Sequence, residues 1–314
     1  MRPNLVRAVT FVAVLLMHMP STPHGPAVAW AQRRALAQQK SVVFVVTAEA
    51  GADAQVEPVA FVNHRGVFEE PMSGGTDGDA NAAFFERYYK SGSKYRLIFG
   101  GAESGSVTVR EAMRAECAPF AARADISTTA KLGGNVMALA TDGTRALRVN
   151  SSRRAPTERE RAAVFQLAKL ILMQKSVRAS AIEHSTATLN LTATDLDGDG
   201  REEMIGSYVV KSGPKVRDTL FLVAVPQGAS YRAAVKKHER INAREMMDPA
   251  LIDSVGEGAL LTELFIEQFD ADGDGVGEVF TVSRSFEGTA YRAYRRQRGA
   301  WRAAYEFYSY RCAY

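Results

Sequence analysis

The chain has 314 residues, of which 46% are hydrophobic and 24% are charged. This is the composition of an ordinary globular protein, and it excludes an intrinsically disordered one. The formal net charge at pH 7 is only +4, which argues against a nucleic-acid-binding protein held by bulk electrostatic attraction. The length is enough for one large or two medium domains.

The first 31 residues have the features of a secretory signal peptide. Arg2 and Arg7 make a short basic start, an apolar run follows over 8–17, and a small-x-small cleavage site ends at Ala31. The apolar run is too short for a permanent membrane anchor, although an uncleaved anchor is the alternative. We expect a secreted or periplasmic protein, cleaved near Ala31, with no stable membrane anchor.

Cys117 and Cys312 are the only cysteines in the chain. In an oxidising compartment they could form a disulfide that ties the C-terminus to the first half of the chain. Two buried free thiols are the alternative, because a single pair of cysteines does not define a disulfide framework.

The segment 32–155 is expected to form a β-rich N-terminal domain. Short apolar and β-branched runs alternate there with glycine-containing and polar turns, which is typical of antiparallel strands. The predicted elements are strands over 42–46, 56–62, 66–68, 95–99, 106–109, 136–140 and 146–149, and one short helix over 80–89.

A helix over 158–175, within a connecting segment 156–180, is predicted to follow this domain. Thr157 and Glu160 have the spacing of a capping box, in which each side chain accepts a hydrogen bond from the other residue's backbone N–H. Apolar residues then recur at helical spacing from Val164 onward.

The remaining segment, 181–314, contains two similar units separated by a helical insert expected over 241–252. Each unit carries the pattern D-x-D-G-D-G-x-x-E after its first strand, and the two copies begin 75 residues apart. A repeat of four strands and one loop is the sequence signature of stacked β-blades. The predicted strands are 186–192, 204–210, 219–225 and 231–236 in the first unit, and 260–268, 279–283, 290–294 and 301–307 in the second.

Both loops carry carboxylates at the same four positions of the motif, and such a cluster favours Ca²⁺ binding. Like charges repel at this spacing, and Ca²⁺ takes about six to eight hard oxygens, which alternate residues of a tight loop can supply. We predict two Ca²⁺ sites, in which Arg201 and Val276 would contribute backbone carbonyls. The predicted ligands are Asp195, Asp197, Asp199, Arg201 and Glu203 in the first loop, and Asp270, Asp272, Asp274, Val276 and Glu278 in the second.

The two loops differ from an EF-hand, because position twelve is Gly206 or Thr281 instead of glutamate and the flanking residues favour strands. The order of strand, acidic loop and strand resembles the calcium loops of FG-GAP and VCBS-type repeats, over about residues 184–312. That resemblance implies blades like those of integrin-like β-propellers, with calcium at the ten positions above. Since a propeller needs more than two blades, either the first half supplies blades without metal loops or the repeats form a smaller assembly, which we favour.

Two alternatives would give the loops another role. Ordinary Asp-Gly turns between strands would need no metal. The run Asp195-Leu196-Asp197-Gly198 also resembles the nucleophile motif of haloacid dehalogenase-type phosphatases, but Asp199 replaces the Thr or Ser of that motif. No serine-hydrolase, zinc-protease or P-loop motif occurs in the chain. We expect a non-enzymatic protein, because a hydrolase would need an acid/base pair that the sequence does not show.

The C-terminal stretch is rich in Tyr and Arg. Tyr291, Tyr294, Trp301 and Tyr305 could form a face that binds an extracellular glycan or protein. Alternatively, the residues at period two from Trp301 face the core of a sheet. The leading expectation is therefore an exported, mainly β protein with a few helices and structural calcium, and a cell-envelope recognition module is the alternative.

Overall fold

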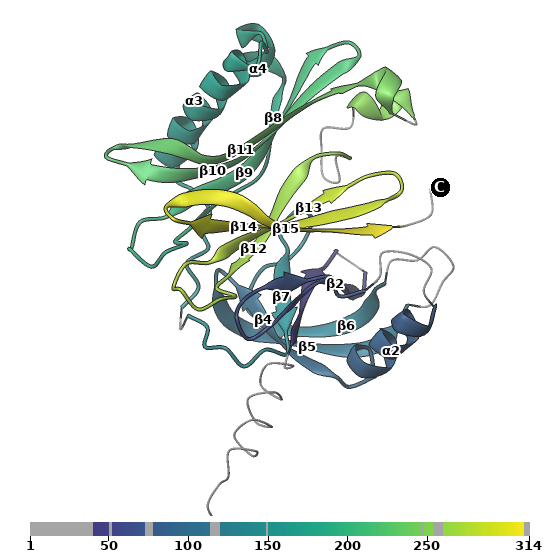
Figure 1. The fold of residues 1–314 in the computed structure, drawn as a ribbon. Helices are drawn as coiled ribbons and strands as arrows, with labels where there is room; N and C mark the ends of the chain where they lie inside the picture. The colour runs from purple at the N-terminus through teal and green to yellow at the C-terminus, as the bar shows by residue number, and fades with distance from the viewer. Residues whose placement is uncertain are drawn as a thin grey trace, which may run out of the picture. The chain divides into compact units, whose positions relative to one another are not determined.

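The computed structural model describes residues 40–49, 52–72, 78–113, 120–148, 150–246, 248–253 and 260–310. Its strands form three sheets, and three α-helices accompany them (Figure 1). The predicted fold class, mainly β with few helices, is therefore confirmed. The predicted signal peptide and both cysteines of the predicted disulfide lie outside the described residues.

The N-terminal half forms a seven-stranded sheet of which six strands close into a barrel. The strand order is β1-β7-β4-β5-β6-β2-β3, and an additional β1–β2 pairing closes the ring. The strands are β1 (Ser41–Thr47), β2 (Ala54–Val62), β3 (Phe68–Glu69), β4 (Lys94–Phe99), β5 (Ala102–Ala112), β6 (Ala122–Thr128) and β7 (Ala138–Thr141).

Apolar side chains from all six strands of the ring meet in one core, which is the barrel interior. Helix α2 (Gly78–Tyr88) adds aromatic rings to this core. The ring centroid of Phe44 lies 6.3 Å from that of Phe84 and 4.8 Å from that of Tyr95. The first half is thus a closed barrel with its own core.

The C-terminal half contains two four-stranded antiparallel meanders, and in each of them the strands are paired in chain order. The predicted acidic loop joins the first two strands of each meander (Figure 1). The first meander consists of β8 (Thr186–Thr194), β9 (Glu203–Gly213), β10 (Val216–Gln227) and β11 (Ser230–Asn242). The second consists of β12 (Glu263–Phe269), β13 (Glu278–Arg284), β14 (Gly288–Gln297) and β15 (Ala300–Tyr310).

The first meander packs against helices α3 (Glu158–Gln174) and α4 (Ala179–Ser185). The predicted capping box begins α3, since Glu160 N–H donates to Thr157 Oγ1 at 3.3 Å and Thr157 N–H donates to Glu160 Oε2 at 2.7 Å. Between the meanders lie two short 3₁₀ helices, η1 (Ala243–Glu245) and η2 (Pro249–Asp253), within the predicted helical insert.

The second meander is covered on both faces. Leu264 and Ile266 of β12 join a core with the outer face of the barrel, whereas Phe265 between them joins a core with the first meander. Because successive side chains of a strand point to opposite faces, every residue of β12 is buried. This double coverage buries even the polar residues of β12, which are Glu263, Glu267 and Gln268.

Of two neighbouring strands predicted over 136–140 and 146–149, the structure forms only the first. That strand, β7, uses its two edges for β1 and β4. Both hydrogen-bonding edges of β7 are therefore occupied, and of 146–148 only Arg148 makes an isolated bridge, to Ala102. Strand β6, which the sequence analysis did not predict, completes the barrel between β5 and β2.

A buried arginine links the barrel to the second meander. The side chains of Arg153 and Glu267 are 4% and 0% exposed, and Arg153 Nη1 lies 2.9 Å from Glu267 Oε2. The same nitrogen donates to the carbonyl oxygens of Met137 at 3.0 Å and Ile266 at 2.8 Å. Replacement of Arg153 would therefore leave a carboxylate buried without its counter-charge.

We predict that Arg153→Met lowers the free energy of unfolding by about 3–5 kcal/mol, because Glu267 loses its buried partner. Chemical denaturation measures this loss. The double variant Arg153→Met/Glu267→Gln should recover part of it, since glutamine carries no charge. An unchanged denaturation midpoint for Arg153→Met would contradict the prediction.

Candidate metal sites in the two acidic loops

The two acidic loops fold in the same way. Asp195 accepts the backbone N–H of Gly198 at 2.7 Å and of Gly200 at 3.0 Å. Asp270 accepts the equivalent N–H groups of Gly273 at 2.6 Å and Gly275 at 3.1 Å. The first aspartate of each motif thus shapes its own loop into a tight turn.

The last residue of each motif closes the loop from the following strand. Leu196 N–H donates to Glu203 Oε2 at 2.8 Å, and Ala271 N–H donates to Glu278 Oε2 at 2.7 Å. Both glutamates are buried. Each loop is therefore held at its first and last carboxylate by its own backbone N–H groups.

Both loops contain a residue with a positive φ angle, a backbone conformation that favours glycine. The φ angles are +80° at Gly200 and +88° at Gly275, the sixth position of each motif. A residue with a Cβ atom would be strained there, whereas glycine is not. The backbone conformation therefore explains why both copies keep the same spacing of aspartates and glycines.

Three carboxylates converge in each loop. Ligand atoms of Asp195, Asp197 and Glu203 lie within 4.8 Å of one another, and so do those of Asp270, Asp272 and Asp274. Of the predicted carboxylate ligands, Asp199 and Glu278 lie outside these groups. The exposed Asp199 instead accepts the backbone N–H of Arg201 at 2.8 Å.

The two buried glutamates of the motifs have raised pKa values. Burial raises the pKa of Glu203 to about 7, the Leu196 N–H opposes the rise, and the charges of Asp197 and Asp195 add to it. Burial likewise raises the pKa of Glu278 to about 7, against the stabilising Ala271 N–H and Arg295. A cation in either loop would oppose this rise in pKa, because opposite charge favours the ionised form.

Arginines of β14 supply part of the missing positive charge. Arg296 Nη1 lies 2.7 Å from Asp197 Oδ2. Arg295 Nε lies 3.3 Å from Asp272 Oδ2 and 2.5 Å from Glu278 Oε1. Two adjacent residues of one strand thus reach the two different loops.

The two loops lie side by side. Gly277 N–H donates to the carbonyl oxygen of Leu196 at 2.8 Å. Arg148 Nη2 donates to Leu196 O at 2.8 Å and to Gly275 O at 3.3 Å, and Nη1 of the same residue donates to Asp195 O. The sequence analysis did not identify Arg148, although four arginines between 145 and 154 were a visible signal.

The turn between β2 and β3 contacts the second loop at Asp272. A Cβ atom added to Gly66, whose φ is +73°, would lie 2.1 Å from the Cβ atom of Asp272. Gly66 also accepts a hydrogen bond from Arg295 Nη2 at 2.6 Å through its carbonyl oxygen. The second loop is therefore part of the contact between the barrel and the second meander.

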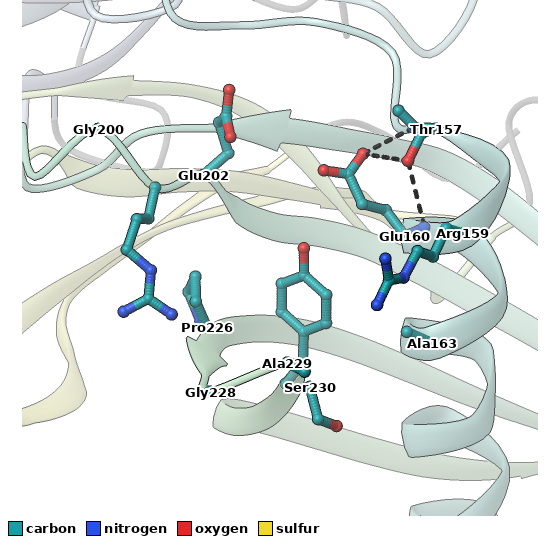
Figure 2. A pocket seen from close by; sticks show the side chains of 12 residues that line it. Thr157, Arg159, Glu160, Ala163, Gly200, Glu202, Pro226, Gly228, Ala229 and Ser230 are labelled. Carbon is teal, nitrogen blue, oxygen red and sulfur yellow. Dashed lines mark hydrogen bonds between the residues drawn. The ribbon is translucent and has the colours of Figure 1, made fainter.

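The first loop instead borders two cavities. One, of about 210 Å³, is lined by Asp197, Arg232, Arg296 and Trp301 among others. The other, of about 390 Å³, lies between the start of α3 and the β10–β11 turn. Figure 2 shows the capping box of Thr157 and Glu160 at one side of the larger cavity and Gly200 of the loop at the other.

Most of the predicted aromatic ligand face is packed. Tyr291 is buried and donates to Glu57 Oε2 at 2.7 Å, and the buried Tyr294 donates to Glu263 Oε1 at 2.8 Å. Tyr305 donates to the carbonyl oxygen of Val59 at 2.9 Å. Of the four predicted residues, Trp301 lines a cavity beside the first loop.

The first loop has an oxygen that fits a cation. Asp197 Oδ1 is buried and has no hydrogen-bond partner among the described residues. The oxygens of Asp195 already accept N–H groups, but a carboxylate offers about four acceptor positions, so these oxygens retain the capacity to bind an ion. The donor set is entirely of hard oxygens, which is the chemistry that Ca²⁺ prefers.

Comparisons of the chain with protein-family models, with curated proteins and with solved structures give no match. Within the described residues, no helix has the length and apolar character needed to cross a membrane.

Proposed function

We propose that this chain is an exported, non-enzymatic β-repeat protein in which each acidic loop binds one structural Ca²⁺ ion. The observation that supports this function best is the duplication of the loop geometry, down to the same N–H groups on the same carboxylates. Two copies of a loop that brings three carboxylates together favour one cation in each loop over two ordinary turns.

Asp195, Asp197 and Glu203 would hold the ion of the first loop, and Asp270, Asp272 and Asp274 that of the second. When bound, Ca²⁺ would supply two positive charges and join side chains that otherwise repel one another. The resemblance to FG-GAP and VCBS-type loops supports the same assignment. The basic and apolar start of the chain supports export.

We predict that Ca²⁺ raises the melting temperature and that a chelator lowers it. Extracellular calcium modules bind with dissociation constants of about 10⁻⁴–10⁻³ M, so ~10 mM Ca²⁺ should add about 1.4–2.7 kcal/mol per site. Differential scanning calorimetry measures the shift. Mg²⁺ is the matched control and should act more weakly, because it requires near-octahedral geometry.

The proposal fails if the melting temperature is the same in Ca²⁺ and in chelator and if titration calorimetry detects no bound ion.

We also predict that Asp197→Ala and Asp272→Ala each remove about one of two bound ions, since each deletes a carboxylate from a different loop. Titration calorimetry gives the number of ions per chain. Asp125→Ala is the matched control, because this aspartate has a 70% exposed side chain on the barrel. Retention of two ions by both loop variants would contradict the assignment of the sites.

A second candidate function, recognition of an extracellular glycan, is favoured by the cavity beside the first loop. Trp301 offers an aromatic face there, and Arg232 is an exposed donor. Aromatic faces and guanidinium groups suit polar ring-shaped ligands. This role would use the first loop as one wall of a binding site while the second loop stays structural.

We predict that a glycan bound on an array is lost in Trp301→Ala and retained in Tyr308→Ala. Tyr308 is the matched control because it is a 43% exposed aromatic residue of the same strand. If the array shows no binding, or if Trp301→Ala binds as the natural chain does, the recognition role is excluded.

A further inference from the structure

The smaller cavity beside the first acidic loop lies where two hairpins meet. Its lining comes from the β10–β11 hairpin of the first meander, from the β14–β15 hairpin of the second and from the loop itself. Arg296 and Trp301 are direct cross-strand partners in the second hairpin, so their side chains share one face of the sheet. Trp301 also packs against the core between the two meanders. This packing holds the indole ring at one side of the cavity.

Two arginines of the lining carry a positive charge that no carboxylate pairs with. Arg201 and Arg232 are exposed, and neither forms an ion pair with a residue that the structure describes. The third arginine of the lining, Arg296, lies 2.7 Å from Asp197 Oδ2. A guanidinium group binds carboxylate and sulfate-like groups through paired N–H donors. Accessible and unpaired arginines at a cavity therefore favour an anionic ligand.

The charge of the lining depends on whether the first loop holds a cation. The lining contains equal numbers of basic and acidic residues, namely Arg201, Arg232 and Arg296 against Asp197, Asp199 and Glu203. Without a cation these charges balance, so an anion gains little net attraction. Ca²⁺ in the first loop would add two positive charges and would compete with Arg296 for the carboxylate of Asp197. The cavity would then attract an anion.

The volume of the cavity limits how much of a ligand it can hold. Sites for drug-sized molecules have volumes of about 300–1,000 Å³, and this cavity is smaller, with about 210 Å³. It therefore suits a single ring with its acidic group instead of a whole oligosaccharide. Trp301 supplies the aromatic surface for that ring, because the face of an aromatic side chain offers a large contact area to a ring-shaped ligand.

We propose that this cavity recognises one acidic residue of a glycan, a sugar ring that carries a carboxylate or a sulfate group, and that it does so only when Ca²⁺ occupies the first loop. Arg201 and Arg232 would bind the acidic group, and the sugar ring would lie against Trp301. The inference rests on the calcium site and the recognition role proposed above. It adds the charge of the ligand and the dependence of its binding on calcium.

The test follows the tryptophan emission of the folded mature chain. Trp30 lies in the predicted signal peptide, so this emission reports on Trp301. The probes are sialyllactose and sulfated lactose, with lactose as the matched neutral sugar, and each is titrated in Ca²⁺ and in chelator. In Ca²⁺ we expect at least one acidic probe to change the emission and to bind about tenfold or more tightly than lactose. Chelator should abolish this binding. Titration calorimetry of the same probes detects any binding that leaves the emission unchanged.

One variant separates recognition of the acid from calcium binding. Arg232→Gln should bind the same number of Ca²⁺ ions as the natural chain, because Arg232 is outside the predicted metal ligands. It should bind the acidic probe about tenfold more weakly, which is the contribution of one charged hydrogen bond. Arg302→Gln is the matched control, since Arg302 is exposed and follows Trp301 on β15. Its side chain points to the opposite face of the strand, so the control should bind the probe as the natural chain does.

The results distinguish failure of this inference from failure of the proposed function. If calorimetry detects bound Ca²⁺ but neither acidic probe binds, the inference is overturned and the calcium sites stand. Equal binding of lactose and the acidic probes would overturn the selection of an acid and leave glycan recognition in place. Equal binding of an acidic probe in Ca²⁺ and in chelator, or to Arg232→Gln and the natural chain, would also overturn the inference. Absence of bound Ca²⁺ would overturn both.

Discussion

The arrangement of the C-terminal half depends on how the negative charge of its two acidic loops is balanced. In each loop, three carboxylate groups lie close together, and the buried glutamate of the motif is one of the three in the first loop but not in the second. Backbone N–H groups and one arginine of β14 per loop offset part of the repulsion. Because the carboxylates of each motif outnumber the arginines of β14 that reach them, we propose that a divalent cation completes the balance.

Charge balance also connects separate parts of the fold. The segment that links the barrel to α3 carries Arg145, Arg148, Arg153 and Arg154. Arg148 bonds backbone carbonyls of both loops, and Arg154 pairs with Glu160 and Glu202 at 2.8 and 3.0 Å. The same segment therefore ties the start of α3, the two loops and, through Arg153, the barrel together.

The two loops have different neighbours despite their similar backbone conformation. The second contacts Gly66 of the β2–β3 turn, whereas the first borders two cavities. Their tips are nevertheless equally open, since residues 198–200 of the first loop and 273–275 of the second are all exposed. The second loop therefore contributes to the contact with the barrel while its tip stays open to solvent.

Local features of the sequence predicted local features of the fold. The acidic motifs, the capping box of α3 and the strands of both meanders follow from residues close together in the chain, and all of them are present. Long-range features were not predictable in the same way. The closure of the barrel by β1–β2 pairing and the bond from Tyr291 to Glu57, 234 residues apart, depend on three-dimensional packing.

For the same reason, the sequence did not distinguish among the four aromatic residues that we predicted to form a ligand face. The structure separates them, because Tyr291 and Tyr294 are covered on the two faces of the doubly packed second meander. Trp301 lies at the start of β15, the last strand of the meander, and borders a cavity. A strand pattern shows which residues share a face, but not what covers that face.

The most direct test of cation binding uses the luminescence of Tb³⁺, a hard cation that replaces Ca²⁺ at oxygen sites. Of the two tryptophans in the chain, Trp30 lies in the predicted signal peptide, so Trp301 would be the sole tryptophan of the mature protein. Because Trp301 and Asp197 line one cavity, excitation of tryptophan should sensitise Tb³⁺ bound in the first loop. The predicted result is emission that Ca²⁺ displaces and that Asp197→Ala abolishes. Absence of sensitised emission, or emission that Ca²⁺ leaves unchanged, would contradict calcium binding at this loop.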